Sequence, residues 1–342
     1  MMKNKAERFL VIFSAVLLFS AVNIFAQEEG VQQAQDEALQ QVREQTPATA
    51  PLQQAKELTL QPQDDTYRQR LRQLVTTSEA PEQEMPQEVD SYIKFIPKTG
   101  ARELSGSVSV VDAASEYSYN LKAFGSIPVE LSLATQYIGI DNSTEVKLPT
   151  ALTGISSGVQ VTLPFFWLDK TYLRFRTAPA FYGENWHTSS SNFRMPSQVF
   201  GIYQPNDKWT FVLGVAVFPE FETKVIPIGG VIYRPNDKWL FNLVPMRPTI
   251  EYFLNDKLTL FLEGEVTGGE FQVKKDEVNK QAIVAYNSAN LGAGIEYALS
   301  KNILGYLSVG AAFNRNFKYR ESLGKVNIKD AFYTQLRMEM AF

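Results

Sequence analysis

The last residues of the chain read AFYTQLRMEMAF, residues 331–342, and apolar and polar side chains alternate through them. Successive side chains of a β-strand point to opposite faces, so the alternation predicts a strand with two unlike faces. One face carries Phe332, Thr334, Leu336, Met338, Met340 and Phe342, and the other carries Tyr333, Gln335, Arg337 and Glu339. The two faces therefore require different surroundings.

The same period of two recurs through the preceding sequence. It is found in residues 117–123, 129–137, 155–163, 173–181, 209–217, 258–266, 291–297 and 303–313. A tilted membrane strand needs about 9 to 11 residues, which is close to the length of these segments. An apolar content of 44% is compatible with this interpretation, because only every second residue of a barrel strand faces lipid. We expect an all-β fold, a transmembrane antiparallel up-and-down β-barrel, with a soluble β-sandwich as the structural alternative.

Three related turns punctuate the pattern: YQPNDKW at 203–209, YRPNDKW at 233–239 and YFLNDKL at 252–258. Pro presets the backbone for a tight turn, and Asn and Asp tolerate the conformations that follow. The flanking aromatic residues would then lie at one level on neighbouring strands, where Tyr and Trp suit a boundary between lipid and water. The predicted aromatic girdle consists of Tyr203, Trp209, Tyr233, Trp239 and Tyr252.

Short and long connections alternate between the predicted strands. Outer-membrane barrels typically have short periplasmic turns and longer external loops. The longest external loops are predicted at Gly183–Arg194, Thr267–Asn287 and Asn314–Asp330. Counting back from a periplasmic carboxy terminus gives about 14 strands, with about 12 as the alternative count.

The amino-terminal part has a different composition. Residues 1–26 are predicted to be a secretory signal peptide, with Lys3, Lys5 and Arg8 ahead of an apolar run from Phe9 to Val22. Residues 27–90 are rich in Gln, Glu and Pro and are predicted to form a disordered periplasmic extension. A short helix through TYRQRLRQLV, residues 66–75, is expected as a transient helix, a docking element or a plug. The barrel is assigned to residues 91–342.

The carboxy-terminal strand resembles the terminal strand of Gram-negative outer-membrane β-barrels, in which alternating apolar residues lead to a final Phe. The matching residues are Phe332, Leu336, Met338, Met340 and Phe342. The segment PIGGVIYRPNDKW, residues 227–239, is similar to an uncharacterised family of porin-like barrels. The resemblance implies a location among outer-membrane lipids and recognition of this strand by the outer-membrane assembly machinery. It leaves monomer and homo-oligomer open.

The face opposite the apolar stripes carries charges of both signs. The candidate lumen residues are Lys122, Glu130, Arg174, Arg176, Glu251, Glu263, Glu265, Glu296, Arg337 and Glu339. Arg or Lys facing lipid near the bilayer midplane would cost about 2 to 4 kcal/mol, so their shared face supports this register. The pattern indicates either a water-filled channel with a charged constriction or a lumen closed by ion pairs.

Little in the sequence points to reaction chemistry. The chain has no Cys and one His, so we expect no metal or cofactor. A net charge of −4 without a basic run excludes a nucleic-acid partner. His187 near Ser189, Ser190 and Ser191 gives a hydrolase hypothesis, although residues so close on a loop rarely place a nucleophile and its base in contact.

The sequence thus favours a protein that is not an enzyme: a passive channel or porin-like transporter for small solutes. The first alternative is a closed structural barrel whose external loops bind a surface partner. The second is a barrel hydrolase that depends on His187. The sequence does not identify the solute.

Overall fold

The computed structural model describes residues 87–123, 127–165, 167–186, 190–218, 224–245, 247–273, 282–320 and 324–342. All of them belong to one compact unit of the chain. The predicted signal peptide and almost all of the predicted extension lie outside the described residues. Within the described part of the chain, no helix has the length and apolar character needed to cross a membrane.

The described residues are almost entirely β-strand. The strands are β1 (Gln87–Gly100), β2 (Ser107–Ala123), β3 (Ile127–Asn142), β4 (Ala151–Pro164), β5 (Thr171–Thr177), β6 (Ala180–Glu184), β7 (Phe193–Arg194), β8 (Ser197–Asn206), β9 (Trp209–Val217), β10 (Val225–Asn236), β11 (Trp239–Asn242), β12 (Thr249–Phe253), β13 (Leu258–Gln272), β14 (Ile283–Ser300), β15 (Ile303–Tyr319), β16 (Lys325–Asn327) and β17 (Ala331–Ala341), with a short 3₁₀ turn η1 (Ser190–Asn192) between β6 and β7.

Three pairs of these segments are single strands of the wall that are briefly interrupted: β5 with β6, β7 with β8, and β16 with β17. Pro179 and Pro196 stand at two of the interruptions, because proline cannot donate a ladder hydrogen bond. The wall continues across them, since β4 pairs with both β5 and β6, and β15 pairs with both β16 and β17. The result is a 14-strand barrel, which confirms the higher of the two predicted counts.

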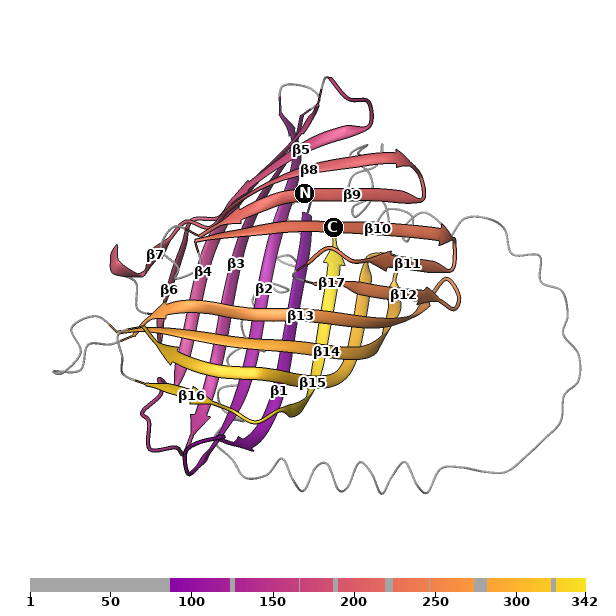
Figure 1. Cartoon of the computed structure of the whole chain (residues 1–342). Coiled ribbons are helices and arrows are strands. Elements are labelled where there is room, and N and C mark those ends of the chain that lie inside the picture. Colours follow the sequence, from indigo (N-terminus) through magenta and orange to yellow (C-terminus); the bar gives the residue numbers. More distant parts are fainter. Residues whose placement is uncertain are drawn as a thin grey trace, which may run out of the picture. The chain divides into compact units, whose positions relative to one another are not determined.

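The barrel closes through β1 and β17, which lie side by side in Figure 1. Ile93 pairs with Leu336 in an antiparallel register, and β1 pairs with β2 on its other side. Every neighbouring pair around the wall is antiparallel. The predicted all-β antiparallel barrel is therefore confirmed.

The outer face of the wall is apolar and exposed, as the alternation predicts. Leu213, Val266, Leu291, Val309 and Phe332 all lie on this face and are exposed. On β17 the opposite face carries buried Tyr333 and Gln335. So large an exposed apolar surface on a single chain indicates contact with lipid.

The two ends of the barrel differ in their connections. We call the end that carries the carboxy terminus and the short connections 207–208, 237–238, 254–257 and 301–302 the turn end. Asn206 supports one of these turns, because its Oδ1 accepts hydrogen bonds from the backbone N–H groups of Lys208 and Trp209 at 3.0 and 3.1 Å. The opposite end, with connections such as 185–192 and 273–282, is the loop end.

An aromatic ladder crosses β8 to β12 near the turn end. Trp209 stacks on Tyr233 with ring centroids 4.0 Å apart, and Trp239 contacts Tyr252 at 4.7 Å. Phe241 stacks on both Tyr233 and Trp239 and so joins the two pairs, and Phe211 stacks on both Trp209 and Tyr203 and extends the ladder to β8. The predicted girdle omits both phenylalanines, although each follows a tryptophan at the strand spacing of two.

The structure differs from the predicted bounds at the first strand and at two of the long external loops. The first strand begins at Gln87, earlier than the predicted start at Ser91. The described residues of the predicted loops at 267–287 and 314–330 are largely strand, since β13 extends to Gln272, β14 starts at Ile283 and β15 extends to Tyr319. These extensions are stable because their inner faces bury an apolar core at the loop end.

We call this core the loop-end core. It includes Ile96, Val108, Ile138, Leu152, Phe271, Val284, Tyr286, Phe317, Val326 and Ile328. The residues come from β1 to β4 and from β13 to the segment joining β16 and β17, and they are almost completely buried. On this side of the barrel, the loop end is filled by packed side chains.

Candidate functional site

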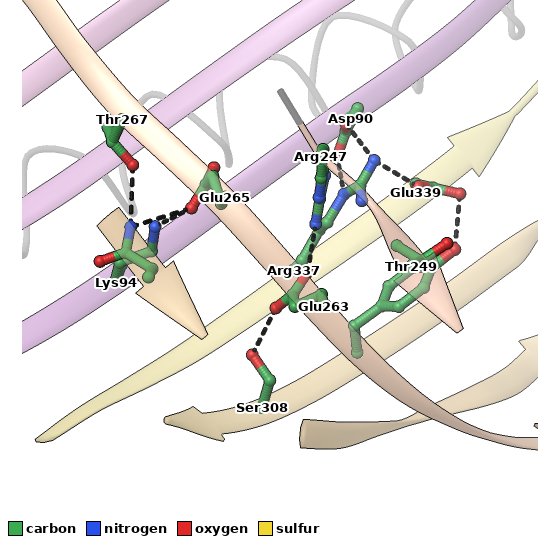
Figure 2. Close-up of polar contacts among 12 residues, drawn as sticks. Asp90, Lys94, Arg247, Thr249, Glu263, Glu265, Thr267, Ser308, Arg337 and Glu339 are labelled. Carbon is green, nitrogen blue, oxygen red and sulfur yellow. Dashed lines mark hydrogen bonds and ion pairs between the residues drawn. The ribbon is translucent and has the colours of Figure 1, made fainter. Parts of the chain in front are cut away.

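The barrel interior between the two ends carries the predicted lumen charges. Adjacent strands direct facing residues to the same side, and the pairing of Asp90 with Glu339 and of Tyr92 with Arg337 brings β1 and β17 together there. The Arg337 guanidinium donates to both carboxylate oxygens of Asp90, at 2.8 and 2.6 Å. It also forms an ion pair with Glu339 at 2.6 Å, and Figure 2 shows Arg337 between the two carboxylates.

A second group of polar residues extends from this cluster towards the loop end. Glu263 forms an ion pair with Arg247 at 3.0 Å and accepts a hydrogen bond from Ser308 at 3.0 Å. Lys94 forms an ion pair with Glu265, as Figure 2 shows. Asn290 donates to Glu265 at 3.3 Å. Three neighbouring groups of paired charges therefore line the β1, β13, β14, β15 and β17 side of the interior.

The remaining lumen candidates lie on other strands. Arg176 forms an ion pair with Glu116 at 2.7 Å, although β3 and β4 separate their strands. Gln160 donates to Glu130 at 2.9 Å, and Arg174 donates to Thr162 at 3.2 Å. These contacts cover the β2 to β5 side of the interior.

Glu251 accepts a hydrogen bond from Thr249 at 3.0 Å, and Glu296 accepts one from Thr259 at 3.2 Å. Lys122 is exposed at the end of β2, beside the turn-end connection 124–126. The predicted residues are thus brought into the interior, except Lys122 at its rim, and most of them carry a polar partner.

Water reaches part of this network. The side chains of Asp90, Glu116, Arg176 and Arg247 are between 33 and 36% exposed, although they belong to interior ion pairs. The loop-end core, in contrast, is packed. The middle of the barrel is therefore accessible to water, while the loop end is filled along β1 to β4 and β13 to β17.

The walls also meet across the loop end. Gln272 of β13 and Gly183 of β6 form a parallel bridge, although these strands are not neighbours around the barrel. Tyr182 packs edge-on against Phe271 with ring centroids 5.6 Å apart. This contact divides the loop end into the packed side and a side bounded by β6 to β10.

The interior face of β8 to β11 is mostly apolar, with polar exceptions that include Gln198 and Thr210, unlike the charged face described above. It carries Phe200, Ile202, Val212, Ala216, Ile228, Ile232 and Leu240. Ile232 and Leu240 are buried together with Phe253, and Val244 packs against them. A passage through this barrel would have one charged wall and one apolar wall.

Several residues of the interior ion pairs are absent from the predicted set, namely Asp90, Lys94, Glu116 and Arg247. The alternation could have assigned Lys94 to the interior, because Lys94 lies two residues from both Tyr92 and Ile96 on the inner face of β1. Asp90 falls inside the predicted extension, where no strand alternation was expected. Arg247 lies in a connection, where no period assigns a face.

The residues of the hydrolase hypothesis are only partly described. His187 and Ser189 lie outside the described residues, and Ser190 and Ser191 form the η1 turn at the loop end. Among the residues with described positions, no group of three or more His, Cys, Asp or Glu side chains could hold a metal ion.

Comparison of the sequence with protein families gives one match, from residue 136 to residue 341, with the family described as Domain of unknown function (DUF6268). The chain belongs to the DUF6268 family. The matched residues run from β3 to β17, so they include most of the wall and most of the charged network. No curated protein matches this DUF6268 chain.

Solved outer-membrane barrels are similar to this chain at very low sequence identity. An outer membrane channel from Pseudomonas putida F1 is 8% identical, with 77% of this chain and 100% of that chain covered and a TM-score of 0.42. A mutant of the TodX monoaromatic hydrocarbon channel is 7% identical, with 75 and 89% covered and a TM-score of 0.40. The KdgM porin in complex with oligogalacturonate is 9% identical, with 75 and 99% covered and a TM-score of 0.32. The likeness extends to the barrel fold alone.

Proposed function

We propose that this DUF6268 barrel is a passive, non-enzymatic channel of the outer membrane that admits small solutes. The observation that carries the proposal is the partial exposure of interior ion pairs in the middle of the barrel. Charged groups inside a lipid-facing wall remain accessible only where water enters, and a water-filled lumen with charges of both signs is the basis of a selective pore.

Conductance across a planar bilayer tests this proposal. The mature chain from residue 27, refolded and inserted in KCl solution, is expected to give steady single-channel steps. A second chain without residues 27–86 keeps β1 intact, because β1 begins at Gln87. Larger steps in the shorter chain would assign the extension to the lumen, and silence in both chains would overturn the channel.

The variant His187→Ala separates the channel from the hydrolase alternative. A passive channel does not need this side chain, so the variant is expected to conduct as the parent chain does. Hydrolysis of a short-chain nitrophenyl ester by the parent chain, abolished in His187→Ala, would favour the hydrolase instead.

We also propose that the outer-membrane assembly machinery recognises β17. The support is the strand's regular apolar face, with Phe332, Leu336, Met338 and Phe342 exposed and Met340 partly buried. Removing Phe342 should reduce the amount of folded barrel in cells while leaving spontaneous folding into detergent micelles unchanged. Equal loss in both settings would assign Phe342 to stability instead.

A further inference from the structure

The hydrogen-bonded wall is interrupted between β10 and β13. The two strands between them are short, as Figure 1 shows: β11 has 4 residues and β12 has 5, whereas β10 has 12 and β13 has 15. Pairing of β10 with β11 begins at Ile232, and pairing of β12 with β13 ends at Glu263. The short strands therefore cover only the part of the wall near the turn end.

Beyond them, both flanking strands keep a partner on one side only. Of the residues that the structure describes, Val225 to Gly230 pair with β9, and Glu265 to Phe271 pair with β14. No described residue pairs with the facing edges of these two stretches. We call this interruption the wall break.

The wall break lies at the depth of the lipid-facing band. Val225 and Val266 stand beside it on the outer face and are exposed, and Val266 is next to Ala289 of the fully paired β14. Backbone groups in hydrocarbon need hydrogen-bond partners, so an edge without sheet pairing at this depth is stable where it faces water, a ligand or other protein. In the described part of the chain, the wall break is therefore an opening in the sheet between the interior and the outer face.

The connection between β11 and β12 borders the wall break at its turn-end side. The Leu243 N–H donates to the Val231 carbonyl, and the Gly264 N–H donates to the Pro248 carbonyl, both at 2.8 Å. These two bonds tie the connection to β10 and to β13. From these bonds towards the loop end, the facing edges of β10 and β13 have no sheet pairing between described residues.

The interior surface beside the wall break is apolar and accessible. Ile226 shares the inner face of β10 with buried Ile228, and its cross-strand partner is Ala216. Ile226 is nevertheless 39% exposed, whereas Ala216 is 0% exposed. The Ile226 side chain at the edge of the wall is thus exposed, although its neighbours Ala216 and Ile228 are buried.

From these observations we infer that the wall break is a lateral exit through which neutral apolar or amphipathic small molecules leave the lumen for the bilayer. The inference rests on the proposed channel and specifies its solute class and route. The bridge between Gln272 and Gly183 confines entry at the loop end to the side bounded by β6 to β10, and the apolar residues of β8 to β11 lead from that side to the wall break. A solute that is partly apolar gains free energy by moving sideways into lipid.

Uptake of N-phenylnaphthylamine by intact cells tests the exit, because this neutral dye fluoresces once it enters lipid. Cells carrying the full chain are expected to take up the dye faster than cells without it. The variant Ile226→Trp should return uptake to the rate of cells without the barrel and leave KCl conductance unchanged. The matched control is Ile295→Trp, since Ile295 is 41% exposed and lies on β14, which is paired on both sides; this variant should keep uptake at the parent rate.

Thiol labelling gives a second measurement that does not depend on a bulky substitution. The chain has no cysteine, so a single introduced thiol reports alone. Ile226→Cys should react both with a charged water-soluble methanethiosulfonate and with a pyrene maleimide dissolved in the bilayer. Ile295→Cys should react with the bilayer reagent alone.

Three results would overturn the lateral exit. They are parental dye uptake by folded Ile226→Trp, labelling of Ile226→Cys from water alone, and oxidation of Ile226→Cys to a disulfide dimer, which would place a second copy on the edge. Conductance without dye uptake would reject the exit and keep the channel. Absence of both would reject the channel as well.

Discussion

Lys94 on β1 forms an ion pair with Glu265 on β13 across the barrel interior, although β14, β15 and β17 separate their strands in the wall. Lys94 is 1% exposed, so its charge needs counter-charges inside the barrel, which Glu265 and the cross-strand Asp112 supply. The pair joins two parts of the barrel that are 171 residues apart in the sequence. It also marks the boundary between the charged network and the loop-end core.

Removing one partner of this pair should be costly. Glu265→Gln is expected to lower the free energy of unfolding by about 3 to 5 kcal/mol, because a buried ammonium loses its counter-charge. Adding Lys94→Met to Glu265→Gln should recover much of that loss. Urea unfolding in lipid vesicles, followed by tryptophan fluorescence, measures both. Equal stability of Glu265→Gln and the parent chain would contradict the role given to the pair.

The aromatic ladder is expected to contribute measurably to the free energy of unfolding. A double-mutant cycle on Trp209→Leu and Tyr233→Leu should give a coupling of about 0.5 to 1.5 kcal/mol, the range for stacked rings in contact. Trp209 and Tyr252 do not form one of the ring pairs found among the described residues. The corresponding cycle on these two residues should therefore give a coupling near zero. Urea unfolding supplies all the values, and equal couplings in the two cycles would count against stacking.

The Asn206 side chain is expected to hold the β8–β9 turn. Asn206→Ala removes an acceptor shared by two backbone N–H groups and should cost about 1 kcal/mol of unfolding free energy. Asn206→Asp keeps an acceptor oxygen at the same place and should cost less. Thermal and urea unfolding of the two variants can be compared directly, and an alanine variant as stable as the aspartate variant would refute the capping role.

Two adjacent glycines should respond differently to the same change. A Cβ on Gly230 would lie 2.6 Å from the Val244 Cα, whereas a Cβ on Gly229 would lie 3.7 Å from its nearest neighbour, Leu213. Gly230→Ala is therefore expected to cost about 1 to 3 kcal/mol through overpacking. Gly229→Ala should stay within about 0.5 kcal/mol of the parent chain. The comparison uses urea unfolding, and a reversed order would show that the connection does not pack as described.

Ion selectivity should follow the sign of the charge that remains in the lumen. Arg176→Gln leaves Glu116 without its partner and should shift the reversal potential in a KCl gradient towards cation preference. Glu116→Gln should shift it the opposite way. Arg102→Gln is the control, because Arg102 pairs with Asp330 in an exposed position at the loop end. Shifts of the same sign in both interior variants would show that these residues do not line the pathway.

Part of this protein follows from local sequence. The alternation in β9, β13 and β17 predicts which side chains face lipid, because the side-chain period of a strand is fixed at two. The Asn-Asp turns predict the short connections, since turn chemistry is a property of a few adjacent residues. Together they predict the closed antiparallel barrel and place most of the charged candidates on its interior face.

The candidate site depends on more distant relationships. The partners of Arg176 and Arg337 come from strands that are remote in sequence, and no local period indicates that Lys94 faces Glu265. The long predicted loops become strands because Phe271 and Phe317 are buried in a core that exists only after the wall closes.

The sequence by itself therefore determined the class of fold, the positions of the short turns and the separation of an apolar outer face from a polar inner face. Each of these depends on interactions within a strand or a turn. The tertiary structure alone decided which charges pair, where the walls meet and where the wall is interrupted. Those features depend on how strands of unequal length align around a curved wall, and they bring together residues whose separation along the chain carries no information about their contact.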